Sequence, residues 1–528
     1  MADANEPGQN KIYEWHPRYN PWLIALAVML STFMEVLDSS VANVSLAHMA
    51  GNLSVSNHEA TWVLTSYLVS NAIILPATAW FSGFFGRKRF LILCTILFTA
   101  SSALCGFANS LGMLVFARVI QGAGGGALVP ISQAILLESF PVEKRGLAMA
   151  VFAMGVVVAP IIGPTVGGWI TDDYSWRWIF FINVPLGILS VLMVKKFVED
   201  PPYIKKIHTS DIDYVGFLLM AVGLGILQVV LDKGQEVDWF EAAWLCWATF
   251  LVVASLTAFV FWELHAKNPV VNLRILKNVN FATGTIIMAV VGAILYATTA
   301  LLPLFLQSLM GYSAYLAGLA ISPRGIGAFL TAIIIGRVGG LIDGRIFVAL
   351  GLGILGWACY DLGKLNLEIG MMNIVWPIIG SGIGISAIFV PLSTITLANL
   401  KKEDMGNGTG LFNLMRNIGG SIGIALATTL IARMSQVHQA MMVSHLTPYD
   451  LVFQERFHTI SQLMALTGRG ASPSLALGVI YQELLRQSAL LAYVDNFRWF
   501  GIASLLCIPL VFLFRKVHVP KDALIAAH

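Results

Sequence analysis

Charged residues are scarce in this sequence. Only 12% of its 528 residues are charged, whereas 57% are hydrophobic and the mean hydropathy is +0.77. A water-soluble globular chain does not need so much apolar surface, so the composition excludes a soluble protein. The five cysteines form no CxxC pair, and we interpret them as small core residues.

Sequence motifs for metal or nucleotide chemistry are absent as well. No HExxH pattern or Cys/His cluster occurs, and all ten histidines lie outside the long apolar segments. A polytopic membrane enzyme is therefore the weaker alternative, and no segment is long enough for the soluble domain of a sensor. Because the P-loop pattern GxxxxGK[ST] is missing too, we expect no ATP and no cofactor, and a proton gradient as the energy source.

Long apolar segments are what the sequence has in excess. A helix needs about 20 apolar residues to cross about 30 Å of hydrocarbon, and fourteen segments meet this requirement. They cover 22–44, 60–82, 90–108, 111–137, 147–170, 179–197, 214–232, 240–262, 280–307, 313–336, 346–362, 371–397, 408–436 and 497–515. The sequence therefore predicts an all-α integral membrane protein with 14 transmembrane helices.

One further segment, 475–493, is helical and fairly apolar but is not predicted to span the membrane. Its centre carries four polar residues, Gln482, Glu483, Arg486 and Gln487. Each charge at the centre of a membrane helix costs about 2.5–3.5 kcal/mol. We interpret the segment as an amphipathic helix within a long external loop at about 437–496.

Lysine and arginine distinguish the two sides of the membrane. Most of the 32 lie in the termini and in alternate linkers, whereas the short loops on the other side hold only Arg177, Lys233 and Lys364. The positive-inside rule then predicts that both termini are cytoplasmic, which requires an even number of spans.

Charged linkers also divide the chain, and its halves are expected to repeat one another. We expect a cytoplasmic segment at 1–21, a six-helix bundle at 22–197, linkers with two inserted helices at 198–278, a second six-helix bundle at 279–516 and a cytoplasmic tail at 517–528.

Five motifs follow one another in this framework. They are LDSSVANVSLA (37–47), GFFGRKR (83–89), RVIQGAGGG (118–126), APIIGPTVGG (159–168) and WRWIFFINVPLG (176–187). In order and helix position they resemble the motifs of the major facilitator superfamily, specifically its fourteen-helix drug:proton antiporters of the EmrB/QacA type. The resemblance covers nearly the whole chain.

This resemblance implies the major facilitator fold and proton-driven export of hydrophobic or amphipathic compounds by alternating-access antiport. It also implies the pump subunit of a tripartite system in a bacterial inner membrane, with a periplasmic adaptor of the EmrA type and an outer-membrane channel. An importer, or an exporter dedicated to one metabolite, lipid or siderophore, stays open as the alternative.

The second motif departs from the family pattern. Gly83 and Phe84 stand where the family has Asp and Arg, whereas the second-half copy, GGLIDGR, keeps the acid as Asp343. If this loop locks the two halves through charge pairs, the lock is weakened here. The residues of the gating loop are Gly86, Arg87, Lys88, Arg89 and Asp343, and a role of the three basic residues as topology anchors is equally open.

Glu35 and Asp38 are the two acids that we identify well inside a predicted span. Their i, i+3 spacing puts them on one face of the first helix. A desolvated carboxyl group beside another acid takes up a proton more readily than in water, as a proton-coupling site requires. The alternative is a buried polar pair that only stiffens the bundle.

Arg118, Arg324 and Arg416 are the basic counterparts inside spans. Arg118 and Asp38 lie seven and six residues from the outer face, so both sit about 10 Å deep at about 1.5 Å per residue. Equal depth permits an ion pair or a water bridge. As supporting polar residues we select Gln121, Asn43, Arg324 and Arg416.

The fifth span carries the antiporter motif, with Pro160, Gly163, Pro164, Gly167 and Gly168. Small residues let helices approach closely, and the prolines bend the helix, so a tight seam between the halves is expected. The resemblance implies that this seam limits proton leak, whereas ordinary glycine packing is the alternative. Aromatic candidates for a substrate cavity are Trp62, Tyr67, Tyr296, Phe305, Trp357 and Phe389, although membrane aromatics also serve packing alone.

Overall fold

The computed structural model describes residues 17–141, 144–200, 213–338, 342–398, 400, 404–466 and 473–515. Throughout these ranges the regular elements are helices, and fourteen helical stretches are long and apolar enough to cross a membrane. This confirms the predicted fold class and the predicted number of spans.

The first seven spans are α1 (Pro21–Val44), α4 (Trp62–Phe85), α5 (Arg87–Gly106), α6 and α7 (Leu111–Gly125 and Leu128–Ser139), α8 (Arg145–Asp173), α9 and α10 (Trp178–Phe181 and Asn183–Phe197) and α11 (Tyr214–Lys233). The other seven are α12 (Ala243–His265), α13 (Val279–Ser308), α14 and α15 (Ala314–Ile321 and Pro323–Val338), α16 (Gly344–Leu362), α17 (Met371–Ala398), α18 (Met405–Val443) and α20 with α21 (Pro473–Leu506 and Ile508–Val511). Short helices α2 (Leu46–Asn52), α3 (Asn57–Ala60) and α19 (Leu451–Leu466) lie in connections.

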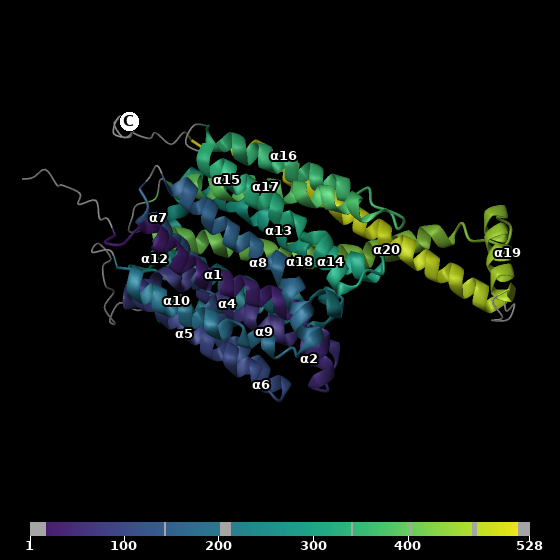
Figure 1. The fold of residues 1–528 in the computed structure, drawn as a ribbon, viewed down its shortest axis with the longest axis horizontal. Coiled ribbons are helices and arrows are strands. Elements are labelled where there is room, and N and C mark those ends of the chain that lie inside the picture. The colour runs from purple at the N-terminus through teal and green to yellow at the C-terminus, as the bar shows by residue number, and fades with distance from the viewer. Residues whose placement is uncertain are drawn as a thin grey trace, which may run out of the picture.

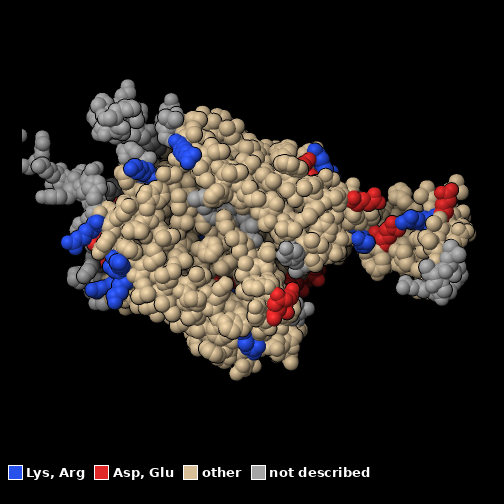
Figure 2. All heavy atoms as spheres, in the orientation of Figure 1, with Lys and Arg blue, Asp and Glu red and all other residues tan. Residues whose placement is uncertain are grey.

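Apolar side chains cover the outside of these helices as well as the inside. In α12, for example, Trp247, Phe250 and Phe261 are exposed. Lipid solvates such side chains, and a helix satisfies its backbone hydrogen bonds internally, so these segments suit the hydrocarbon of a bilayer. Figure 2 agrees with this placement, since it shows a flank of the body that is nearly free of charged residues.

The helices form two packed sets that meet along two seams (Figure 1). In one set α1 packs against α7, α8 and α10, and in the other α13 packs against α17 and α18. One seam joins α8 to α14, α15 and α17, and the other joins α18 to α4 and α7. The pair α11 and α12 lies beside the second seam, with α11 against both α4 and α18.

The segment at 437–496, predicted as an external loop with one amphipathic helix at 475–493, contains that helix but is helical over most of its length. α18 continues to Val443, α19 follows at Leu451–Leu466, and α20 runs without a break from Pro473 to Leu506. The predicted amphipathic helix at 475–493 and the predicted last span are therefore one helix. Figure 1 shows the end of α18, α19 and the start of α20 projecting beyond the bundle.

A regular stripe of small and apolar side chains explains why α20 extends so far. Ala476, Ile480, Leu484 and Ser488 recur every fourth residue and are buried. Ala476 and Ile480 pack with Ile460 of α19, so the projection has a small core of its own. The polar residues that argued against a span lie in this part, where Glu483 pairs with Arg456 at 2.8 Å.

Candidate functional site

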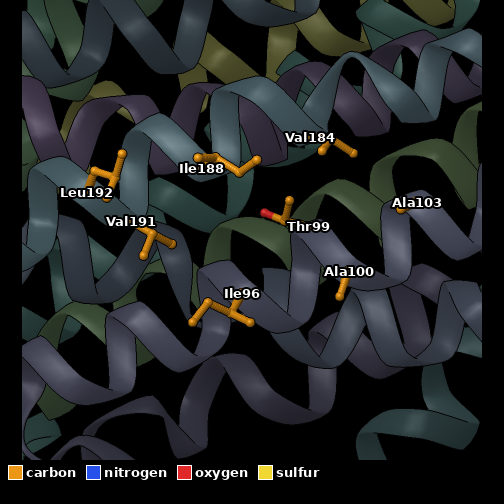
Figure 3. Close-up of a pocket in the computed structure, with 9 residues that line it drawn as sticks. Ile96, Thr99, Ala100, Ala103, Val184, Ile188, Val191 and Leu192 are labelled. Carbon is orange, nitrogen blue, oxygen red and sulfur yellow. The ribbon is translucent and has the colours of Figure 1, made fainter.

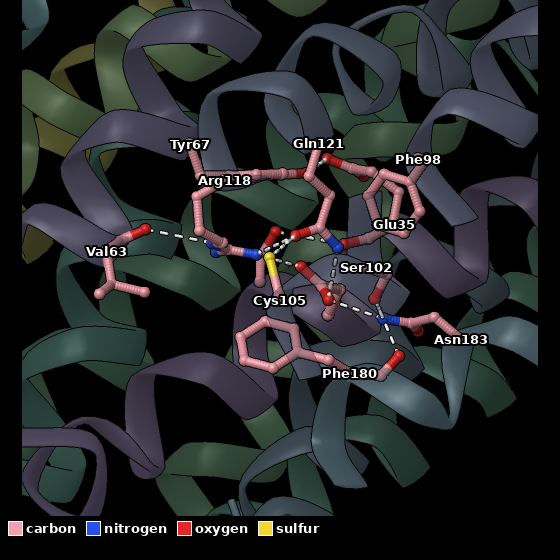
Figure 4. Close-up of polar contacts among 12 residues, drawn as sticks. Glu35, Val63, Tyr67, Phe98, Ser102, Cys105, Arg118, Gln121, Phe180 and Asn183 are labelled. Atoms are coloured by element: carbon pink, nitrogen blue, oxygen red, sulfur yellow. Dashed lines mark hydrogen bonds and ion pairs between the residues drawn. The ribbon is translucent and has the colours of Figure 1, made fainter. Parts of the chain in front are cut away.

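The Asp38 carboxylate is the centre of a buried polar network between α1, α6 and α10. Figure 4 shows three of its neighbours, Arg118, Gln121 and Asn183. Oδ2 accepts a hydrogen bond from Arg118 Nη1 at 2.6 Å. Oδ1 accepts from Gln121 Nε2 at 2.9 Å and from Asn183 Nδ2 at 2.7 Å. The ion pair that equal depth permits is therefore present, and Gln121 joins it as predicted. Each of the four side chains is at most 2% exposed.

Arg118 is held by neutral partners as well as by its counter-ion. Its Nε donates to the Val63 carbonyl oxygen at 3.1 Å and its Nη1 donates also to Gln121 Oε1 at 2.9 Å. The guanidinium carbon lies 4.3 Å from the centre of the Tyr67 ring. A buried ion pair persists only when its geometry and hydrogen bonds offset the loss of water, and these contacts meet that condition.

Glycines of the RVIQGAGGG motif bring α6 close enough for these contacts. A Cβ atom on Gly122 would lie 2.4 Å from the Tyr67 carbonyl oxygen of α4, and one on Gly124 would lie 2.8 Å from the Phe98 nitrogen of α5. The backbone of α6 therefore touches two neighbouring helices directly. This approach lets the Arg118 side chain reach α1 and α4 together.

Glu35 lies on the same side of α1 but has different partners. Its Oε1 accepts from the Tyr67 hydroxyl at 2.9 Å and from Asn71 Nδ2 at 3.2 Å. The two acids therefore form two adjacent sites, because Asp38 binds α6 and α10 whereas Glu35 binds α4. Tyr67 connects them, since its hydroxyl binds Glu35 and its ring lies against Arg118.

Sequence reasoning missed Asn183 and Asn71 and assigned Tyr67 to a substrate cavity. Asn183 donates to Asp38 and to Ser102 Oγ, the latter at 3.0 Å. A signal for it existed, because Asn183 is a polar residue that interrupts the apolar stretch WIFFINVPLG. Asn71 is polar and central in its span, which is the same kind of signal.

Asn43 does not join the network, which corrects its selection as a supporting residue. Its side chain is exposed, and the described residues offer it no hydrogen bond. The reason is rotation, since the five residues from Asp38 to Asn43 turn a helix by about 140°. Asn43 also lies five residues nearer the end of α1 at Val44 than Asp38 does, so its side chain is both off to the side of the cluster and beyond it.

Arg324 and Arg416 are buried in the other half of the chain and do not contact Asp38. Arg324 donates to three hydroxyl groups, those of Ser381 at 3.1 Å, Thr299 at 2.8 Å and Thr298 at 3.3 Å. Arg416, on α18, is 4% exposed and has no hydrogen bond or ion pair with any described residue. Its charge does interact electrostatically with Glu35.

The residues assigned to the gating loop lie in different surroundings. Arg87 is buried and forms an ion pair with Glu138 at the end of α7. Sequence reasoning missed Glu138 because it lies just past the predicted end of the span. Lys88 is half-buried and Arg89 is exposed. Arg87 is therefore a buried member of an ion pair, and not only a solvent-exposed residue that fixes membrane topology.

Gly86 and Asp343 shape the starts of two helices. Gly86 precedes α5 with φ +85°, a left-handed conformation that favours glycine. Asp343 is exposed and caps α16, where its Oδ1 accepts from the Arg345 backbone nitrogen at 3.1 Å. Asp343 and Arg87 are not brought together.

The antiporter motif packs mainly against α1. A Cβ on Gly163 would lie 2.3 Å from Ser40 Oγ, and one on Gly167 would lie 2.7 Å from a methyl carbon of Val41. Pro164 has no N–H for the Pro160 carbonyl one turn earlier, and Ser40 Oγ donates to that oxygen at 3.1 Å instead. These two glycines therefore join α8 to the helix that carries both acids, while α8 as a whole also forms the expected seam with α14, α15 and α17 of the opposite half. Within the motif Thr165 faces Gly318 of α14, and nearer the start of α8 Leu147 faces Gly336 of α15.

The six aromatic candidates do not line a common cavity. Phe305 and Phe389 fill the core, whereas Trp62 and Trp357 are 40% and 51% exposed. Tyr296 packs on Gly420, and Tyr67 belongs to the polar network. An apolar pocket of about 310 Å³ lies elsewhere, between α5 and α10 (Figure 3). Its lining includes Ile96, Thr99, Ala103, Ile188 and Leu192.

Proton exchange is the chemistry that this arrangement supports. Two buried carboxylates lie on one helix, and each is held by donors that can also bind a neutral acid. The described residues contain no group of His, Cys, Asp and Glu side chains suited to a metal ion.

Comparison with known proteins places these features in a family context. The profile of the Major Facilitator Superfamily matches residues 28–424. The chain is 38% identical to the multidrug export protein EmrB of Haemophilus influenzae, over 94% of this chain and 95% of that protein. It is 36% identical to the fatty acid resistance protein FarB of Neisseria gonorrhoeae, over 93% and 96%. Among solved structures, the human organic anion transporter MFSD10 has a similar fold, with a TM-score of 0.61 at 13% identity over 94% of this chain and all of that one.

Proposed function

The chain belongs to the major facilitator superfamily and is a membrane transporter rather than an enzyme, and on that premise we propose that it exports hydrophobic or amphipathic compounds in exchange for protons. The names of its relatives, multidrug export protein and fatty acid resistance protein, support export of such compounds. The single observation that carries proton coupling is the buried Asp38–Arg118 pair with its amide donors Gln121 and Asn183.

Coupling follows from the charge balance of this pair. A proton on Asp38 removes the counter-charge of Arg118, and a buried unpaired guanidinium is strongly unfavourable. Proton binding therefore favours a conformation in which Arg118 gains water or another partner, and proton release favours the closed pair. Because Ser40 and Val41 of α1 pack against α8, a movement of α1 also moves α8 at the seam with α14 and α15.

Transport in everted membrane vesicles tests this function. With an acidic interior, an exporter that exchanges substrate for protons accumulates a hydrophobic cation such as tetraphenylphosphonium inside, and the interior becomes more alkaline as it does so. Entry of the substrate together with protons would identify a symporter and would overturn the proposal.

The chain lies in a bacterial inner membrane with both termini in the cytoplasm. Support comes from the charge distribution, because Figure 2 shows lysines and arginines gathered at the end where α1 begins. The positive-inside rule assigns that end to the cytoplasm. The projection formed by α18, α19 and α20 then lies on the periplasmic side.

This projection docks a periplasmic adaptor of the EmrA type, which connects the pump to an outer-membrane channel. Its tip carries large apolar side chains, with Tyr449, Leu451 and Val452 at least 74% exposed. Exposed apolar groups on a part that extends beyond the bundle are typical of a protein-binding surface.

A further inference from the structure

Arg416 differs from the other arginines buried in the spans. The Arg118 guanidinium pairs with Asp38, and the Arg324 guanidinium donates to three hydroxyl groups. Arg416 is 4% exposed, yet its buried Nε has no hydrogen-bond partner within the described part of the chain. A buried guanidinium without an acceptor is costly, so a position of this kind indicates a binding role.

The location of Arg416 is the seam between the two halves. Asn413, one turn earlier on α18, donates from Nδ2 to Gln133 Oε1 of α7 at 2.6 Å. Residues three apart share a face of a helix, so Arg416 lies on the side of α18 that meets α7. Its charge also acts on Glu35 of α1. Arg416 therefore lies on the face of the second half that meets α7, where its charge reaches the helix that carries Glu35.

Other polar atoms of this seam are also without partners. Among the buried atoms with no hydrogen bond are Arg416 Nε, Gln133 Nε2, Asn413 Oδ1 and Asn417 Oδ1. Two of these are donors and two are acceptors, and all belong to α7 or to one turn of α18. Buried polar atoms are normally paired, so several unpaired ones together mark a place where a polar group from outside the chain would find partners.

We propose that Arg416 binds the carboxylate of anionic amphipathic substrates at this seam, with Gln133 as a second donor. The planar guanidinium offers parallel N–H groups that match the two oxygens of a carboxylate. Substrate and Glu35 then compete for one positive charge, which connects substrate binding to the helix that binds protons. This assignment rests on the proposed export function and adds a substrate class to it.

Equilibrium binding to the full chain in lipid nanodiscs tests the assignment. The probes are pyrenebutyrate and its neutral alcohol, pyrenebutanol, which share their apolar part. In the wild type, pyrenebutyrate binds more tightly than pyrenebutanol. Arg416→Gln weakens the binding of pyrenebutyrate by about tenfold, the effect of losing a charge-assisted contact, and changes the binding of pyrenebutanol less than about twofold.

Two further variants separate binding from structure. Arg416→Lys keeps the charge but not the planar fork, so it retains an intermediate preference for pyrenebutyrate, and it replaces Arg416→Gln if that variant fails to fold. Arg324→Gln also removes a buried arginine, and it leaves the ratio of the two affinities unchanged. Equal affinity of the wild type for both probes, or equal weakening of both by Arg416→Gln, would overturn the assignment.

The same preparation distinguishes this assignment from the export function. If tetraphenylphosphonium drives proton movement in the wild type and pyrenebutyrate does not bind selectively, only the carboxylate site is wrong. If no substrate moves protons while pyrenebutyrate binds through Arg416, the export function is wrong and the anion site stands.

Discussion

Arg118 Nη1 lies 2.6 Å from Asp38 Oδ2, and both side chains are about 99% buried. Two charges in this position stabilise each other, but neither tolerates loss of its partner. The pair therefore connects protonation of one helix to the position of another. The consequences of changing each member can be measured separately.

Removing Arg118 alone should destabilise the protein more than removing the whole pair. Arg118→Gln leaves the Asp38 carboxylate buried without its counter-ion, a change that costs about 3–5 kcal/mol. Arg118→Gln combined with Asp38→Asn removes both charges and should recover much of the stability. Thermal denaturation of the variants in detergent measures the loss of stability in each. Additive losses in the double variant would contradict a direct ion pair.

Asn183 should matter although it carries no charge. Asn183→Ser shortens the side chain and removes a hydrogen bond to Asp38, which is worth about 1.5–3 kcal/mol when the partner is charged. We expect substrate-dependent proton movement to fall by about tenfold or more, and Asn43→Ser, an exposed asparagine in another span, to have little effect. Similar activity in the two variants would show that the network does not depend on Asn183.

The contact between α8 and α1 should tolerate no added volume at Gly163. Gly163→Ala places a methyl group where Ser40 Oγ lies 2.3 Å away, and overpacking of this kind costs about 1–3 kcal/mol. Gly168→Ala is the matched control, because the nearest atom to its Cβ is 4.0 Å away. Transport rates and thermal stability should both fall in the first variant and not in the second. Equal behaviour of the two alanine variants would contradict the packing described for α8.

Deletion of the projection should separate adaptor binding from transport. A variant without residues 445–490 keeps all of α18 and the bundle part of α20, so membrane insertion and substrate binding should persist. Co-purification with an adaptor of the EmrA type should be lost. Adaptor binding at the wild-type level would place the docking surface elsewhere on the chain.

The membrane explains how much of the fold could be predicted. A bilayer fixes the length of a span and requires the backbone to bond internally, so hydropathy identified all fourteen spans. Outside the bilayer this constraint is absent. The continuity of α20 from Pro473 was missed for that reason, since it depends on packing against α19 and not on membrane depth.

At the site, the depth of a residue in the membrane could likewise be predicted, but the direction in which its side chain points around the helix could not. Asp38 and Arg118 could be paired because counting residues from the membrane face gives their depth. Asn43 is five residues further along the same helix, and its side chain points away. Ser40 could not be assigned, because its role depends on the carbonyl that Pro164 leaves unpaired on a different helix.

Drug-dependent proton flux in Asp38→Asn vesicles tests the central claim most directly. Asparagine keeps the size of the side chain and can still hydrogen-bond to Gln121 and Asn183, but it cannot bind or release a proton. We expect tetraphenylphosphonium still to bind to Asp38→Asn but to move no protons, whereas Glu35→Gln retains weakened flux because Asp38 is intact. Wild-type flux in Asp38→Asn would contradict the account and would assign proton coupling to another acid.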